Sequence, residues 1–120
     1  MNLRRVLIVD DSALTLDMTR AALEEIGILV ATANTMRELE LHDPSNYDLI
    51  LMDVQMPELY GDDVAATLRH VRHARVRMVL FSNLPADELA TRAADAGVDG
   101  YICKQAGLPA IVQRVTELLA

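Results

Sequence analysis

Acidic, hydroxyl and basic side chains stand at the ends of four apolar segments in this sequence. Asp10 and Asp11 follow the first segment, and Asp53 follows the third. Ser82 and Lys104 follow the fourth and the fifth. An unpaired charge is expensive to bury within a strand, so these side chains are expected at strand ends, where they can face a ligand.

The combination of these residue types is typical of phosphoryl-transfer chemistry. Clustered carboxylates raise one another's pKa unless a cation lies between them, and Mg²⁺ suits an all-oxygen ligand set that also admits phosphate. An aspartate can act as the nucleophile and form an aspartyl phosphate. Lys104 and the metal would balance the charge of the phosphoryl oxygens, to which the Ser82 hydroxyl could donate a hydrogen bond.

Each of these residues also has an ordinary structural explanation. Asp10 and Asp11 could simply cap a helix, and Asp53 could be a turn residue. Ser82 and Lys104 could be solvated loop residues. Unrelated loop residues would rarely provide this set at four separate strand ends, so a shared site is the better interpretation.

The elements that must position these residues alternate between β-rich apolar segments and helical patterns. Strands are predicted at Arg5–Val9, Ile28–Ala33, Tyr47–Met52, Arg77–Phe81 and Tyr101–Cys103. Helices are predicted to follow Ser12, Thr35, Gly61, Pro85 and Pro109, in that order. In the first helix, Leu14, Met18, Ala22 and Ile26 recur every four residues, which predicts its apolar face, and Gly27 ends it.

Length and composition indicate one soluble domain spanning residues 1–120. Hydrophobic residues make up 52% of the chain, yet no apolar run approaches the roughly 20 residues that span a bilayer. The net charge of −7 argues against direct nucleic-acid binding and is compatible with a cation site. The single cysteine, Cys103, excludes an internal disulfide and fits a reducing compartment, so a cytoplasmic protein without a membrane partner is expected.

Apolar strands that alternate with helices favour an α/β fold, in which a doubly wound parallel sheet is covered by helices on both faces. The carboxyl ends of all its strands lie at one edge. Ligands bind at this edge in open α/β sheets. The topology therefore brings the three aspartates, Ser82 and Lys104 together.

Over essentially its whole length, the chain resembles the receiver domain of two-component response regulators (CheY-like). The resemblance rests on three motifs and three further residues in a fixed order: VLIVDDS at 6–12, LMDVQMP at 51–57, Gly61, Ser82, AGVDGY at 96–101, and Lys104. It implies a flavodoxin-like, five-stranded sheet of order 2-1-3-4-5.

The resemblance also implies a role for each matching residue. Asp53 would accept the phosphoryl group, and Mg²⁺ would be held by Asp10, Asp11, Asp53 and the backbone carbonyl of Gln55. The remaining implied roles fall on side chains: Lys104 would pair with the phosphoryl group, Ser82 would move toward it, and Tyr101 would follow inward.

The protein implied by this resemblance is a regulatory switch. It would catalyse only its own phosphorylation and dephosphorylation, so it is not expected to be an enzyme in its own right. A sensor histidine kinase or a phosphotransfer protein would supply the phosphoryl group. The face built from the fourth helix, fifth strand and fifth helix would then bind a downstream effector protein or domain.

The chain departs from the family pattern beside these residues. Gln105 follows Lys104, where the family usually has a proline after a cis peptide bond, so a trans bond and a loop of different shape are expected. Asn83 is bulkier than the small residue usual after the switch hydroxyl. Leu84 and Gln55 occupy positions at which the family tunes its dephosphorylation rate.

Three other functions compete with the phosphorylated switch. An aspartate-nucleophile phosphohydrolase would use similar chemistry, but it usually needs extra segments to hold its substrate. A nucleotide or flavin binder is disfavoured because no glycine-rich loop follows the first strand. A receiver-like interaction module that no longer uses phosphorylation stays open because of Asn83 and Gln105.

Overall fold

The central sheet runs through the middle of the protein and holds every strand in parallel. The computed structural model describes residues 3–57, 60–70 and 75–120, and over these residues the sheet has five strands in the order β2-β1-β3-β4-β5. Their bounds are Arg5–Val9 (β1), Leu29–Ala33 (β2), Leu49–Asp53 (β3), Arg77–Ser82 (β4) and Gly100–Cys103 (β5). The predicted doubly wound fold and its strand order are confirmed.

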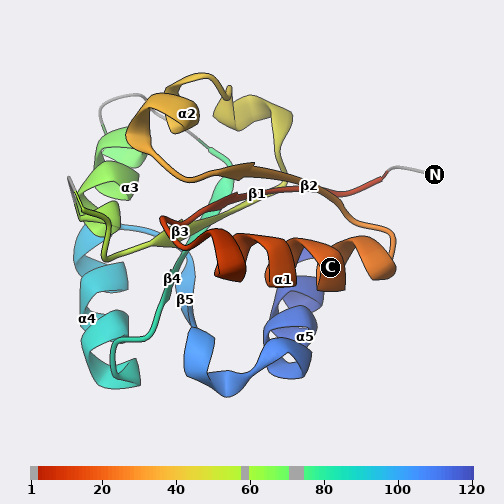
Figure 1. Ribbon diagram of the computed structural model, residues 1–120. Coiled ribbons are helices and arrows are strands. Elements are labelled where there is room, and N and C mark those ends of the chain that lie inside the picture. The colour runs from red at the N-terminus through yellow and green to blue at the C-terminus, as the bar shows by residue number, and fades with distance from the viewer. Residues whose placement is uncertain (1–2, 58–59, 71–74) are drawn as a thin grey trace.

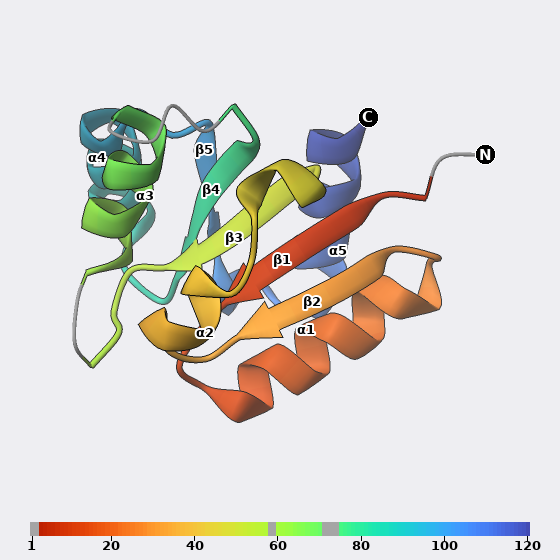
Figure 2. The same ribbon diagram turned by 90° about the horizontal axis from the view of Figure 1, so that it is seen from above.

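Helices cover both faces of this sheet, as Figures 1 and 2 show. One face carries α1 and α5, and the other carries α2, α3 and α4. The helices span Ala13–Glu25 (α1), Met36–Glu40 (α2), Gly61–His70 (α3), Ala86–Ala96 (α4) and Leu108–Leu119 (α5), with short 3₁₀ turns at Pro44–Asn46 and Lys104–Ala106.

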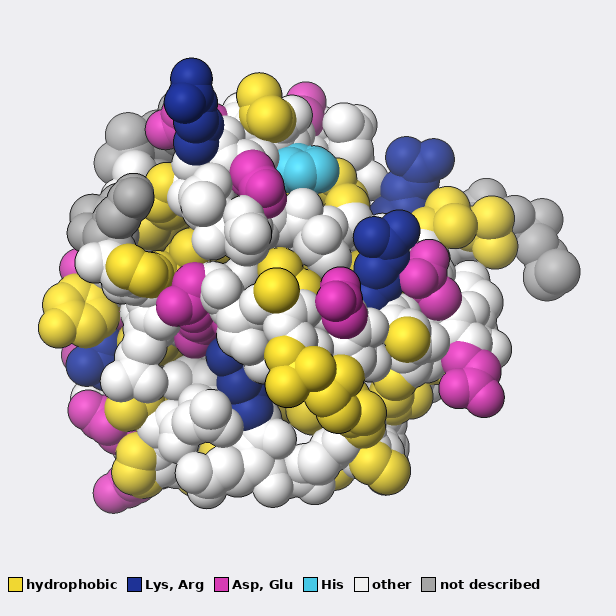
Figure 3. All heavy atoms as spheres, in the orientation of Figure 1, with side chains coloured by type: hydrophobic (Ala, Val, Ile, Leu, Met, Phe, Trp, Pro, Cys, Tyr) yellow, Lys and Arg dark blue, Asp and Glu magenta, His cyan; other side chains and the backbone are white. Residues whose placement is uncertain are grey.

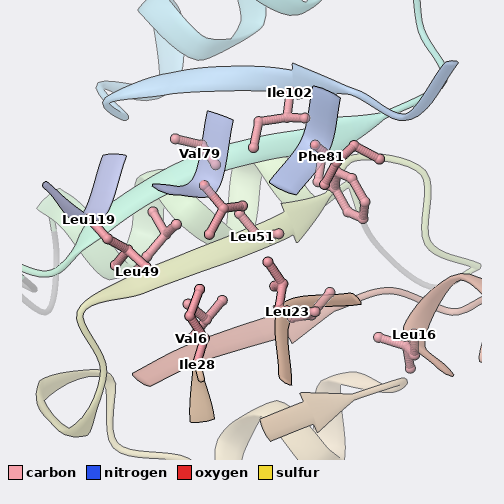
Figure 4. Close-up of a cluster of buried hydrophobic side chains, with 13 residues drawn as sticks. Val6, Leu16, Leu23, Ile28, Leu49, Leu51, Val79, Phe81, Ile102 and Leu119 are labelled. Atoms are coloured by element: carbon pink, nitrogen blue, oxygen red, sulfur yellow. The ribbon is translucent and has the colours of Figure 1, made fainter. Parts of the chain in front are cut away.

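The α1–α5 face is filled by one large hydrophobic cluster. Alternate strand residues, among them Leu49, Leu51 and Phe81, point to this side because successive side chains of a strand face opposite ways. They pack against Leu23 of α1 and Leu119 of α5, and Figure 4 shows Leu119 beside Leu49.

The opposite face is divided between two clusters. The larger one packs α2 and α3 against residues such as Leu7 and Met52. The smaller one packs α4 through Leu89 and Ala93 against Val54 and Leu80. A separate, small cluster therefore holds α4 on the sheet.

The predicted helix starts agree with the capping contacts. The Ser12 hydroxyl accepts a hydrogen bond from the Thr15 N–H at 3.2 Å, and the Thr35 hydroxyl accepts one from the Glu38 N–H at 3.1 Å. Gly27 follows α1 with a φ of 88°, the left-handed conformation typical of a residue that ends a helix.

The predicted apolar face of α1 is wrong. Leu14, Met18 and Ile26 are exposed, whereas Leu16, Thr19 and Leu23 are buried. Both rows of residues recur at helical spacing, so periodicity alone did not identify the row that meets the sheet. The consequence is an apolar stripe on the surface of α1, and Figure 3 shows hydrophobic side chains gathered on this face of the molecule.

Among the described residues, we find no helix with the length and apolarity required to cross a membrane. The strand bounds differ from the predicted ones by up to two residues. The largest change is in β3, which begins at Leu49 rather than Tyr47 and includes Asp53 as its last residue.

Candidate functional site

The carboxyl edge of the sheet brings together the residues that the sequence singles out. Strand register explains the juxtaposition: β1 and β3 pair Val9 with Met52, so Asp10 and Asp53 come next to each other at the same level. Asp11 completes the group, since carboxylate oxygens of all three residues lie within 4.8 Å of one another. Asp11 is exposed, whereas the other two are buried.

Asp53 ends β3 in the centre of this edge, where it is only 3% exposed. Its Oδ1 lies 3.5 Å from the Lys104 ammonium and accepts a 3.3 Å hydrogen bond from the Gln55 N–H. The backbone behind it is closely covered, because a Cβ on Gly61 would lie 1.6 Å from the Asp53 carbonyl oxygen. Only glycine fits at that position without moving the strand.

The environment of Asp53 favours its protonated form. Burial is the main cause and raises its pKa to about 7, with Asp10 and Asp11 acting in the same direction. The Lys104 ammonium and the Gln55 N–H oppose this shift. A cation among the three carboxylates would stabilise the ionised form, and the donor set, all oxygen and rich in charge, fits a hard divalent ion.

Lys104 is the basic member of the group. Its ammonium lies 2.5 Å from Asp10 Oδ2, closer than to Asp53, so it bridges the two buried carboxylates. The ammonium also lies 5.2 Å from the centre of the Phe81 ring, a cation–π distance that the sequence did not suggest. The Lys104–Gln105 peptide bond is trans, as predicted.

Asp10 is held in place by the start of the first helix. Its Oδ1 accepts a 2.9 Å hydrogen bond from the Ser12 N–H, which leaves Oδ2 for Lys104. The cap of α1 is therefore Ser12 rather than Asp10, which fixes the Ser12 backbone with one oxygen and contacts Lys104 with the other.

Ser82 ends β4, the strand next to β3, and is fully buried. Its hydroxyl accepts a 3.2 Å hydrogen bond from the Leu84 N–H within its own turn. Tyr101 on β5 is partly buried and packs against the small cluster beneath α4. Both residues thus lie on strands that contact α4.

Asn83 and Gln105, the two residues that depart from the family pattern beside Ser82 and Lys104, contact each other at this edge. The Gln105 side-chain amide donates a 3.4 Å hydrogen bond to the Asn83 backbone carbonyl. The loops that follow β4 and β5 are thus joined by Asn83, which follows Ser82, and by Gln105, which follows Lys104. The two departures from the family pattern, at positions 83 and 105, are therefore joined by one hydrogen bond.

The profile of the response regulator receiver domain matches residues 6–116 of this chain. The chain belongs to the response regulator receiver domain family. Receivers are regulatory domains of two-component signal transduction, so the resemblance drawn from the motifs is confirmed.

Known receivers and proteins that contain them match nearly the whole chain. The gliding motility regulatory protein of Myxococcus xanthus is 36% identical over 95% of this chain, which spans 15% of that protein. The polar-differentiation response regulator DivK of Brucella anthropi is 31% identical, with 97% of this chain and 96% of that protein covered. The receiver fold therefore occurs both alone and within longer proteins among these relatives.

A solved receiver structure has a ligand of direct interest. The response regulator TrrA of Thermotoga maritima, in complex with Mg²⁺–BeF, superposes with a TM-score of 0.82 at 26% identity, covering 98% of this chain and 100% of that one.

Proposed function

We propose that this receiver accepts a phosphoryl group on Asp53, with Mg²⁺ as its cofactor, and thereby changes its binding to a downstream partner. The observation that carries the proposal is the position of Asp53, buried at the end of the central strand with two carboxylates and an ammonium around it. The Mg²⁺–BeF complex of TrrA supports the same chemistry for this fold.

The proposed reaction moves a phosphoryl group from a phosphohistidine, or from a small acyl phosphate, to an oxygen of Asp53. The P–N or P–O bond of the donor breaks as the new P–O bond forms, so a phosphohistidine leaves as neutral histidine after taking up a proton, and an acyl phosphate leaves as a carboxylate. Asp53 must be ionised to attack, so its raised pKa must fall when the site is loaded.

Asp10, Asp11, Asp53 and the backbone carbonyl of Gln55 would hold Mg²⁺. The metal would supply positive charge to the carboxylates and to the phosphoryl oxygens. Lys104 already lies within 3.5 Å of Asp53, so it can turn from Asp10 toward a phosphoryl oxygen with little movement. Its cationic head needs no proton transfer for that role.

Ser82 would leave its hydrogen bond with Leu84 and donate to a phosphoryl oxygen. Because Ser82 ends β4, this step would displace the turn that leads into α4. Tyr101 packs against the α4 cluster and would move inward with it. The face formed by α4, β5 and α5 would therefore differ between the two states of the site, and it would bind the effector.

The phosphodonor, a sensor histidine kinase or a phosphotransfer protein, would bind beside α1. This helix begins two residues after Asp11, and its Leu14 and Met18 side chains are 69% and 47% exposed. An apolar stripe next to an acidic edge suits a partner that must bring its phosphoryl group to Asp53.

Asp53→Asn tests the proposal. The wild type should be labelled by acetyl phosphate and should bind Mg²⁺–beryllofluoride, and the Asp53→Asn variant should do neither while keeping its fold. Asp63→Asn is the matched control, which should be labelled like the wild type, because Asp63 is an exposed aspartate in the first turn of α3. Labelling of Asp53→Asn at the wild-type level would contradict the assignment.

A receiver-like interaction module without phosphorylation is the second candidate. The Gln105–Asn83 contact favours it, because this hydrogen bond joins the loops through which a signal would pass. A wild type that binds Mg²⁺ but takes neither acetyl phosphate nor beryllofluoride would support this candidate over the first.

A further inference from the structure

A cluster of four side chains joins the loop after Asp53 to α4. Arg92 of α4 lies at its centre. The Arg92 Nη1 donates to both oxygens of Asp62, at 3.2 and 3.4 Å, and its Nη2 lies 3.7 Å from Glu88. The guanidinium carbon lies 5.5 Å from the centre of the Tyr60 ring. We call these four residues the Arg92 cluster.

Within the Arg92 cluster, the Asp62–Arg92 pair is partly removed from water, whereas Tyr60 and Glu88 are exposed. The side chains of Asp62 and Arg92 are 15% and 29% exposed, whereas both side chains of the Arg20–Glu24 pair on α1 are nearly half exposed. Tyr60 and Asp62 flank Gly61 in sequence, so Arg92 contacts the chain on both sides of that glycine.

Gly61 places the cluster directly behind the phosphoacceptor. Its N–H donates a 2.9 Å hydrogen bond to the Val54 carbonyl, and it lies against the carbonyl of Asp53. Gln55 and Tyr60 form an isolated antiparallel β-bridge. The backbone of Asp53 is thus joined to Arg92 through one glycine and one carboxylate.

A second connection between the segment around Asp53 and α4 is apolar. Val54, which follows Asp53, is fully buried against Leu89 and Ala93 of α4. Two segments next to Asp53 therefore contact α4, one through a charge and one through packing. The charged connection crosses from α3 to α4, whereas the buried residues beneath these two helices form separate clusters.

We infer that Arg92 is a positioning residue that couples the state of the Asp53 site to α4 through Asp62 and Tyr60. The inference rests on the proposed function and extends it. A change in the loop behind Asp53 alters the place of Asp62, and Arg92 transmits that change to the middle of α4. The coupling is independent of Ser82 and Tyr101, which reach α4 through β4 and β5.

The first experiment tests the coupling in the free protein by amide hydrogen exchange of α4. Arg92→Gln and Asp62→Asn should each speed exchange of α4 amides about two- to fivefold, the range expected for one partly exposed ion pair. The double variant should not exceed Arg92→Gln, since that single variant already removes the Arg92–Asp62 ion pair together with the Arg92–Glu88 pair. Arg20→Gln, which breaks the exposed Arg20–Glu24 pair on α1, is the control and should leave α4 unchanged.

The second experiment measures the response of α4 to Mg²⁺–beryllofluoride. In the wild type and in Arg20→Gln, the complex should change α4 exchange. In Arg92→Gln, it should still bind, as followed by ¹⁹F NMR, but the α4 change should fall by half or more. A purely structural role of Arg92 would move the free-protein rates and leave this ligand-dependent difference intact.

The outcomes separate the inference from the proposed function. A wild type that does not bind beryllofluoride contradicts the proposed function. Binding with a full α4 response in Arg92→Gln, or additive effects in the double variant, contradicts the inference alone. If Arg92→Gln does not fold, Asp62→Asn provides the same test, because it keeps the Arg92–Glu88 pair.

Discussion

The two faces of the sheet are packed in different ways. The face under α1 and α5 is one continuous cluster that includes buried side chains from four of the strands and both helices. The face under α2, α3 and α4 is divided, and α4 lies on a cluster of four buried residues, two of them on the helix itself. The same sheet thus carries one face with a single core and one face with two clusters of buried residues, with the partly buried Val98 packed against both clusters.

This difference indicates which helix can move alone. Helices that share a core are displaced together, because interiors are close-packed and a shift leaves voids. The α4 helix contributes Leu89 and two alanines as its buried residues, so a shift of α4 leaves the larger cores intact. Local opening follows such divisions of the core.

The largest expected effect comes from removing a core side chain on each face. Leu51→Ala should lower the free energy of unfolding by about 3–5 kcal/mol and speed exchange throughout the protein. Leu89→Ala should lower it by about 2 kcal/mol and speed exchange chiefly in α4. Chemical denaturation and residue-resolved hydrogen exchange measure both. If Leu51→Ala and Leu89→Ala lowered the free energy of unfolding equally and both sped exchange throughout the protein, the proposed difference between the two faces would be contradicted.

Gly61→Ala tests the contact that joins the site to the divided face. The added Cβ would overlap the Asp53 carbonyl oxygen, so the strand or α3 must shift, and about 1–3 kcal/mol of stability should be lost. Beryllofluoride affinity should fall as well, because Asp53 moves. Denaturation and a binding titration check these two expectations. Unchanged affinity would show that the loop and the site move independently.

Asp53→Asn should stabilise the metal-free protein at pH 8. The pKa of Asp53 is raised to about 7 by burial, so the native state keeps a proton that the unfolded chain has released above about pH 4. Native stability therefore falls as pH rises from about 4 to 7. Asparagine cannot ionise, so it removes this loss. At pH 8 in the presence of a chelator, we expect the free energy of unfolding of Asp53→Asn to exceed that of the wild type by on the order of 1–3 kcal/mol.

Thermal unfolding from pH 4 to 8 measures this effect. The control is Asp63→Asn, which should keep the wild-type slope because Asp63 is exposed. A pH slope that survives in Asp53→Asn would assign the raised pKa to another group.

The smallest expected effect is stabilisation by Mg²⁺. A ligand that binds only the native state adds about 1.4 kcal/mol at a concentration ten times its dissociation constant. Most of the protection should appear in α4 and around Asp53 rather than in α1 and α5, which sharpens the contrast between the faces. Thermal unfolding with Mg²⁺ and with chelator measures the stabilisation, and hydrogen exchange shows where the protection lies. Protection spread evenly over the protein would contradict the expected difference between the faces.

Much of this protein could be predicted from its sequence because the strongest signals are local. Strand length, the lone charge of Asp53 after an apolar run, and the capping pattern at Thr35 each need only a few neighbouring residues. Parallel topology then requires the strand ends to share one edge, and this requirement alone predicts that Lys104 lies near Asp53. The observed separation of 3.5 Å between the ammonium and the carboxylate confirms that proximity.

The features that could not be predicted from the sequence depend on contacts between residues far apart in the chain. Two rows of α1 have helical spacing, and only the position of the sheet selects Leu23 over Met18. Arg92 and Asp62 are 30 residues apart, and no motif links them. The Gln105–Asn83 hydrogen bond likewise depends on how two loops approach each other.

The bridging position of Lys104 has a consequence for the electrostatic charge of the acidic edge. With its three carboxylates ionised, the edge carries a net charge of two negative units, because the ammonium offsets one of the three. One divalent cation would bring that total to neutrality. Apparent metal affinity should therefore fall as monovalent salt rises, and charge reversal at Lys104 would shift that salt dependence more than loss of any single exposed acid elsewhere on the protein.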